Sequence, residues 1–248
     1  MPDRSFSDPS RRPAPDEFIR ARPAEGMLLT SDDRRVTALP ETLMQTLHRG
    51  FAQAGGDNRQ VLYHAGYEWG LQDMLDLNSR MRQETGAENQ PDLWRRDAPF
   101  VLERWAAPFA AAGWGACIFD LSFHHKGITF VELRQSAAAA AVGRAAAPVC
   151  HLYAGLFAGA LSFYDRVETH AVEIECAALG HGCCRFIVGP GTVIDEAESA
   201  RQSGLAHEAI RRLVLEARAP GASRAAGQPP TPAAAAAPAK AARIPWKK

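Results

Sequence analysis

A cluster of cysteine and glutamate residues in the second half of the chain is the feature that most constrains the fold. Four of the five cysteines lie between residues 150 and 184, and residues 173–184 add carboxylates and a histidine. These residue types are the ligands of structural zinc sites, in which four side chains must meet in space. If they bind a metal, Cys150, Cys176 and Cys184 must therefore be brought together by the fold.

The spacing of these cysteines leaves two interpretations open. A Cys-x7-Cys pair (Cys176 and Cys184) is not the knuckle of a zinc finger, and free cysteines are often small buried hydrophobes. A hairpin can nevertheless bring the pair together, because Gly180 and Gly182 permit a tight connection. For Cys117, which alternates with apolar residues, we predict a buried strand position and no metal.

The periodicity of apolar residues predicts an α+β protein, with an antiparallel sheet of two hairpins covered by helices and with disordered N- and C-terminal tails. We expect a loop over residues 79–92, and we expect Pro108 to kink or end its helix early. Gly66 and Gly70 give one helix a small face that another backbone can approach. The expected helices begin near residues 40, 59, 97, 148 and 195, and the expected hairpins cover 27–39, 117–133 and 168–188.

Two terminal segments differ from the rest in composition. Residues 1–25 hold five prolines among charged and polar residues, and residues 219–248 are rich in alanine and proline. Neither has enough apolar side chains to offset the entropy of ordering. We therefore expect a disordered segment over 1–25, one folded domain over 26–218, and a disordered basic tail over 219–248.

Charge and hydropathy exclude several classes of protein. Lys and Arg number 28 and Asp and Glu also number 28, which argues against a generally basic protein that binds nucleic acid directly. No apolar run approaches the ~20 residues of a membrane-spanning helix, and the N-terminus has no apolar signal segment. We therefore expect a cytoplasmic protein without a membrane span, in which the cysteines stay reduced.

The chain carries Cys150, Glu173, Cys176, Gly180, Cys184 and Phe186 at fixed spacing. This pattern resembles the 4-vinyl reductase domain family. This family includes proteins assigned to bacteriochlorophyll 4-vinyl reduction and the sensor domains of phenol- and xylene-responsive regulators, and its fold is similar to that of vesicle-tethering TRAPP subunits. The family signature is a cysteine, a glycine-containing helix and then E-x-x-C-x3-G-x3-C-x-F. The matching positions are Cys150, Glu173, Cys176, Gly180, Cys184 and Phe186.

The resemblance implies a structural zinc ion, because in the sensor members a zinc is held by Cys, Glu, Cys and Cys. Carried over, the metal ligands here are Cys150, Glu173, Cys176 and Cys184. Four protein ligands leave no open position for water. On an ideal strand Glu173 and Cys176 point to opposite faces, so the chain must bend before Cys176. The resemblance also implies a homodimer, with the face around Gly66 and Gly70 as one candidate contact.

The same resemblance implies a buried pocket, and aromatic residues on the expected flanking elements suit a hydrophobic or aromatic small molecule. Three classes of function compete: a non-enzymatic sensor or carrier that acts through an output protein, a tetrapyrrole vinyl reductase or its accessory protein, and a protein-interaction scaffold. No dinucleotide, phosphate-binding or cluster-binding motif supports a reductase, so we predict no catalytic residue. The candidate ligand-binding residues are Trp105, Phe119, Phe123, His124, Phe130, Phe157 and Tyr164.

Overall fold

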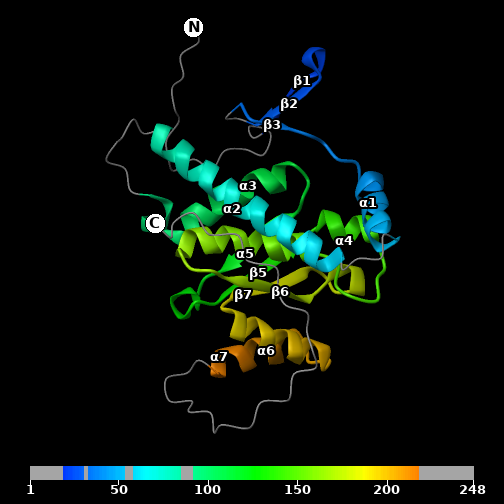
Figure 1. The fold of residues 1–248 in the computed structure, drawn as a ribbon, viewed down its shortest axis with the longest axis vertical. Coiled ribbons are helices and arrows are strands. Elements are labelled where there is room, and N and C mark those ends of the chain that lie inside the picture. The colour runs from blue at the N-terminus through cyan, green and yellow to red at the C-terminus, as the bar shows by residue number, and fades with distance from the viewer. Residues whose placement is uncertain (1–18, 31–32, 54–57, 85–91, 218–248) are drawn as a thin grey trace.

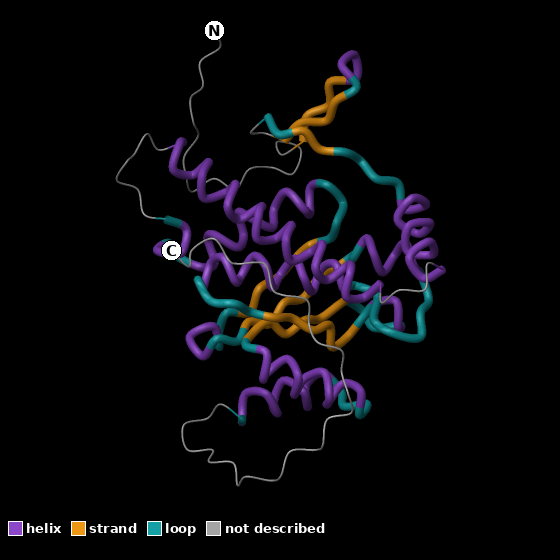
Figure 2. Tube along the Cα trace, in the orientation of Figure 1, coloured by secondary structure: helices purple, strands orange, loops and turns teal. Residues whose placement is uncertain are grey.

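The computed structural model describes residues 19–30, 33–53, 58–84 and 92–217 (Figure 1). Its centre is a four-stranded antiparallel sheet with helices on both faces (Figure 2). The α+β prediction is confirmed. No helix in these ranges has both the length and the apolar character needed to cross a membrane.

The central sheet consists of two hairpins, as the alternation of apolar residues predicts. The strands are β4 (Ala116–Asp120), β5 (Thr129–Arg134), β6 (His170–Glu175) and β7 (Cys184–Gly189). Their order is β4-β5-β7-β6, and all neighbours are antiparallel. The two hairpins therefore join through β5 and β7, which places the β6–β7 connection and its cysteines at one end of the sheet.

One face of this sheet is covered by a layer of long helices. These are α2 (Asn58–Glu84), α3 (Ala98–Ala111) and α5 (His151–Asp165), and Figure 1 shows α2 lying over α5. Their apolar side chains and those of β5 and β7 form the larger hydrophobic core. Helix α5 is buried along nearly its whole length because it lies between α2 and the sheet.

Glycines make the contact between α2 and α5 unusually close. A Cβ atom at Gly66 or Gly70 would lie 2.0 or 2.1 Å from a carbonyl oxygen of α5, and Gly155 and Gly159 face carbonyl oxygens of α2 in the same way. Only glycine permits such an approach of two backbones. The small face that the sequence suggested for a dimer contact is therefore occupied by a helix of the same chain.

Two shorter helices cover the opposite face of the sheet. They are α6 (Gly191–Gln202) and α7 (His207–Glu216), and they form a second core with β5, β6 and β7. The prediction of one helix over about 195–218 is wrong. The chain turns at Gly204, whose φ of +79° favours glycine, and α7 folds back along α6 (Figure 1).

The N-terminal residues form a small sheet apart from the central one (Figure 1). It contains β1 (Ile19–Arg22), β2 (Met27–Thr30) and β3 (Arg35–Val36), and a short 3-10 helix, η2 (Pro23–Glu25), joins β1 to β2. Strand β1 pairs with β2 along its full length, so this sheet includes residues before the expected boundary at residue 26. Residues 1–18 and the tail from residue 218 lie outside the described residues.

The remaining elements connect these layers. Helix α1 (Glu41–Gln53) packs against the short helix α4 (Ala137–Val142), which follows β5. Three further 3-10 turns are η3 (Leu93–Arg95), η4 (His124–Lys126) and η5 (Ala177–Leu179).

Two local predictions on the helix layer differ from the structure, the loop over 79–84 and an end of the helix at Pro108. Residues 79–84 continue α2, and Met81 is buried in the core, so the predicted loop is wrong over these residues; residues 85–91 lie outside the described residues. Helix α3 continues through Pro108 to Ala111. Its predicted start is confirmed, since the Asp97 side chain caps the helix by accepting from the Phe100 N–H.

Candidate metal centre

The four residues proposed as metal ligands converge at one end of the β6–β7 hairpin. Cys150 immediately precedes α5, Glu173 lies on β6, Cys176 precedes η5 and Cys184 begins β7. All four are buried, and one donor atom from each lies within 4.8 Å of the others. A cysteine that is distant in sequence is thus brought to the hairpin by the packing of α5 on the sheet.

A β-bulge solves the geometric conflict between Glu173 and Cys176. Glu173 pairs with Phe186 and Glu175 pairs with Arg185, so β6 has one more residue than β7 between these pairs. An extra residue rotates the strand and redirects the side chains that follow. The predicted bend before Cys176 is confirmed.

The Glu173 carboxylate is only half satisfied by the protein. Its Oε2 accepts a hydrogen bond of 2.9 Å from the backbone N–H of Cys150. Its Oε1 is buried and has no hydrogen-bond partner among the described residues. Burial, followed by the nearby Cys176 thiolate, raises the pKa of Glu173 to about 8. An oxygen in this position costs free energy unless a cation or a proton occupies it.

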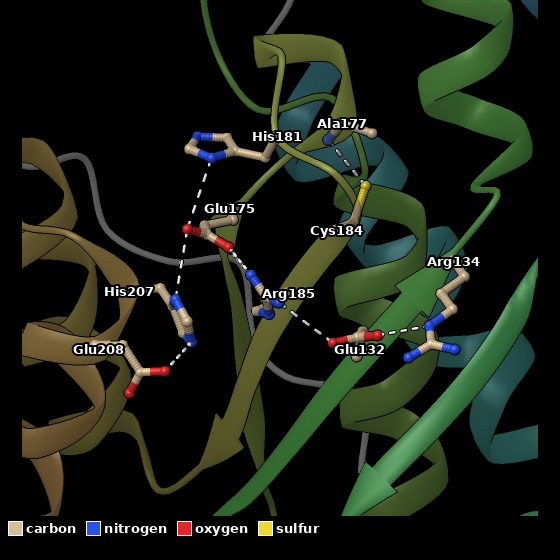
Figure 3. A network of polar contacts seen from close by, with 9 residues as sticks. All are labelled: Glu132, Arg134, Glu175, Ala177, His181, Cys184, Arg185, His207 and Glu208. Atoms are coloured by element: carbon tan, nitrogen blue, oxygen red, sulfur yellow. Dashed lines mark hydrogen bonds and ion pairs between the residues drawn. The ribbon is translucent and has the colours of Figure 1, made fainter.

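The three thiols interact with one another and with nearby donors. The Sγ atoms of Cys150 and Cys184 are 3.6 Å apart, and hydrogen bonds from both thiols lower the pKa of Cys176. The hydrogen bond to Cys176 and burial raise the pKa of Cys150. Without a cation, only part of the cluster can therefore be ionised. The backbone N–H of Ala177 also donates to the Cys184 Sγ, at 3.3 Å (Figure 3).

The charged residues beside the ligands form a separate network on the other face of the sheet. Arg185 follows Cys184 on β7 and pairs with Glu175 and Glu132 (Figure 3). The Glu175 Oε1 lies 3.6 Å from the Nδ1 of His181 and 3.5 Å from the Nδ1 of His207 on α7. His181 and Arg185 thus connect the hairpin to α7 through Glu175.

Three of the seven candidate ligand-binding residues lie together in the larger core. The ring centroids of Trp105, Phe119 and Phe157 are 6.1–6.4 Å apart. Trp105 is 2% exposed. Its indole N–H has no hydrogen-bond partner among the described residues. A buried donor without an acceptor is unusual in a protein core.

The other four candidates lie in two further places. Phe123 and Phe130 pack against each other in the smaller core on the opposite face. The Arg211 guanidinium lies 4.2 Å from the centroid of the Phe130 ring. His124 and Tyr164 have ring centroids 5.9 Å apart, and the Tyr164 hydroxyl donates to the Arg96 carbonyl. The seven residues therefore do not line a single pocket.

His124 is held by polar groups on both sides of its ring. Its Nδ1 lies 3.0 Å from the Thr129 Oγ1, and its Nε2 lies 3.1 Å from the Asp165 carboxylate at the end of α5. The hydrogen bond to Asp165 raises the pKa of His124 and outweighs the opposing effect of burial. This arrangement ties η4 to the helix layer.

Sequence reasoning missed two further features. The Ser136 hydroxyl lies 3.3 Å from the Cys150 Sγ; only its place before an alanine-rich helix hinted at a capping role. A hollow of about 350 Å³ lies on the N-terminal sheet, where the sequence shows only short apolar runs. It is lined by Ala21, Pro23, Gly26, Met27, Leu28, Arg35, Val36, Thr37 and Ala38.

Comparison with known proteins identifies the class of domain. Residues 129–190, which contain all four candidate ligands, match the model of the V4R domain. The match lies over the residues that carry the sequence resemblance and agrees with it. A search of curated proteins finds no match.

The fold is similar to that of a solved sensory domain. The phenol-responsive sensory domain of the transcription activator PoxR, solved with phenol, has a TM-score of 0.56 at 18% identity over 79% of this chain and 92% of its own. A vinyl-4-reductase family protein from Methanocaldococcus jannaschii scores 0.40 at 18% identity, covering 62% of this chain and 82% of its own. A trafficking protein particle complex subunit 3 from Naegleria fowleri, covalently bound to palmitic acid, has a TM-score of 0.44 at 12% identity. The match covers 60% of this chain and 93% of its own.

Proposed function

We propose that this protein is a zinc-stabilised domain that binds a small molecule, as a sensor or carrier, and passes its signal to a partner protein. The observation that carries the proposal is the convergence of Cys150, Glu173, Cys176 and Cys184, with a buried Glu173 oxygen that no described residue satisfies. Because all four donors come from the protein, the ion would be structural.

The donor set suits zinc. Three thiolates and one carboxylate match its preference for sulfur, nitrogen and oxygen ligands in a tetrahedron. Burial and the negative charge of Cys176 raise the pKa of Glu173, and a dication would compensate that charge. It would also join α5 to both strands of the β6–β7 hairpin.

The unpartnered indole N–H of Trp105 supports a small aromatic ligand with an oxygen acceptor. It lies among the rings of Phe119 and Phe157, which provide an apolar surface. The similar PoxR sensory domain was solved with phenol. We therefore assign Trp105 as the residue that orients the ligand, with the other two rings as its walls.

The metal is tested by elemental analysis of the purified full chain. We expect about one zinc per chain, from the ligand count. Iron in place of zinc, or a fully stable protein with no metal, would refute the structural-zinc proposal.

The ligand is tested with a matched pair of probes, phenol and benzene, by titration calorimetry. Phenol should bind about tenfold more tightly, since one hydrogen bond contributes about 1.4 kcal/mol. Trp105→Phe should abolish this difference, whereas Trp94→Phe should keep it, because Trp94 packs elsewhere against Phe163 and Arg166. Equal binding of the two probes by the natural chain would contradict the proposal.

Two further parts of the proposal concern partners and catalysis. We propose a homodimer, which sedimentation at micromolar concentration tests; a monomeric mass would exclude it.

We also propose that the protein is not a reductase. Turnover of a vinyl tetrapyrrole with NADPH by the pure protein would overturn this and favour the reductase alternative.

A further inference from the structure

The chain makes a tight turn between β5 and α4, beside the candidate metal centre. Gln135 has a φ of +55°, a left-handed conformation that non-glycine residues rarely adopt. Ser136 follows as the N-cap of α4 and is 3% exposed. A strained residue that precedes a buried hydroxyl suggests that the position of this hydroxyl matters.

The contacts of Ser136 leave its hydroxyl proton free to point toward the sulfur of Cys150. Its Oγ accepts from the backbone N–H of Ala139 at 3.2 Å, so its own O–H remains available as a donor. The Cys150 Sγ lies 3.3 Å away. When Cys150 binds a metal it is a thiolate without a proton, and the serine hydroxyl must then be the donor.

A hydrogen bond from the Ser136 hydroxyl would offset part of the buried negative charge of the metal site. Three thiolates, one carboxylate and a divalent ion leave a net charge of −2 in a buried volume, and hydrogen bonds to the sulfur atoms offset such charge. The Cys184 sulfur accepts from the Ala177 N–H, and the Glu173 carboxylate accepts from the Cys150 N–H. Ser136 gives the Cys150 sulfur the corresponding partner.

Ser136 also connects the site to helices outside it. The same oxygen caps α4, and α4 packs against both η5 of the hairpin and α1. A second link follows α4, where the Ala145 N–H donates to the Ala178 carbonyl in η5 at 2.9 Å. The short helix α4 is thus attached to the candidate metal centre at its start and beyond its end.

We propose that Ser136 is a positioning residue of the metal centre. Its hydroxyl donates to the Cys150 thiolate, and through this bond metal binding holds the start of α4 and, through α4, supports α1. This inference rests on the proposed metal site and adds a residue outside the four ligands.

The test uses the full chain loaded with Co²⁺, whose thiolate charge-transfer bands report the environment of the sulfur atoms. Ser136→Ala and Ser136→Gly should move these bands to lower energy, since a thiolate without a donor is oxidised more easily. They should also weaken Zn²⁺ binding about 10- to 100-fold in chelator competition, as is usual for partners of metal ligands. Ser136→Thr, which keeps the hydroxyl, should restore both properties.

Two controls separate this role from helix capping. Glycine is tolerated at an N-cap, so Ser136→Gly should change the bands with little loss of thermal stability. Asp97→Ala removes the N-cap of α3 and should lower thermal stability without changing the bands. Metal removal should speed amide hydrogen exchange in α4 more in the natural chain than in Ser136→Ala.

The outcomes distinguish the inference from the proposed function. Unchanged bands and unchanged affinity in Ser136→Ala, in a chain that binds one Co²⁺, would refute the role of Ser136 and leave the metal site standing. A natural chain that takes up neither Zn²⁺ nor Co²⁺ would refute both.

Discussion

Gly66 of α2 lies so close to Leu152 of α5 that a Cβ atom on the glycine would be 2.0 Å from the leucine carbonyl oxygen. The clash would involve backbone atoms on both helices, which cannot move without shifting the whole contact. We therefore predict that Gly66→Ala destabilises the protein by at least 1–3 kcal/mol, the usual cost of overpacking a core. Urea unfolding measures this change.

Gly50 provides the matched control for this prediction. It also lies in a helix, but a Cβ atom there would meet nothing within 4 Å. Gly50→Ala should therefore stabilise the protein by about 0.5–1 kcal/mol through helix propensity. If the two variants were equally stable, the close contact of α2 with α5 would be refuted.

The candidate metal centre predicts unequal effects of replacing different residues. Cys184→Ser should lose zinc and lower the free energy of unfolding, because metal-binding energy is folding energy when the site forms only on folding. Glu173→Gln should lose less zinc, since an oxygen remains. Cys117→Ser should keep the full zinc content, because Cys117 lies outside the group of four donors. Zinc is measured in the purified variants, and loss of zinc from Cys117→Ser would contradict the assignment.

The pair of His124 and Asp165 predicts a pH-dependent contribution to stability. The folded pKa of His124 is raised, so the pair stabilises the fold below the ordinary histidine pKa of about 6.5. The contribution disappears as the pH rises through the folded pKa. Asp165→Asn should lower the His124 pKa, as measured by NMR titration.

The loss of stability in Asp165→Asn should accordingly be larger at pH 5.5 than at pH 8.5. Glu168→Gln is the control, because Glu168 lies 4.0 Å from the more exposed His170, outside the pair of His124 and Asp165, and its replacement should leave the pKa of His124 unchanged. An equal loss of stability at both pH values would show that the pair does not titrate as described.

The smaller core predicts that α7 is part of the cooperative fold. Ile210 is fully buried against the sheet, while Leu205 in the preceding turn is 41% exposed. Ile210→Ala should cost about 2–5 kcal/mol and Leu205→Ala less than about 0.5 kcal/mol. Both values come from urea unfolding, and a small effect of Ile210→Ala would mean that α7 detaches before the sheet unfolds.

The sequence was most informative where the periodicity of apolar residues and the residue types indicated the same structure. The alternation of apolar residues predicts the hairpins of the central sheet. The family signature predicts the four donors, and the opposite directions of Glu173 and Cys176 on an ideal strand predict the bend before Cys176. The aromatic residues were harder to place. Phe119 and Phe130 both look like core positions of one hairpin, but they lie on opposite faces of the sheet and so belong to different cores.

Other features depended on tertiary contacts that local sequence does not encode. Strand β1 forms because β2 pairs with it, although its own segment is polar and rich in proline. Gly66 and Gly70 indicated a close backbone contact, but nothing in the sequence showed that the partner was α5 of the same chain. Ser136 gained its contact with Cys150 only through the packing of α5 on the sheet.

The alternation along β7 has a consequence for how the chain avoids misfolding. Cys184 faces the helix layer and Arg185 the opposite side, so a slip of one residue in the pairing of β7 would exchange them. The slipped strand would bury a guanidinium and remove one sulfur from the cluster, so it could not be captured by a metal. If the proposed metal binds, it would therefore favour the correctly registered hairpin, which offers all four donors.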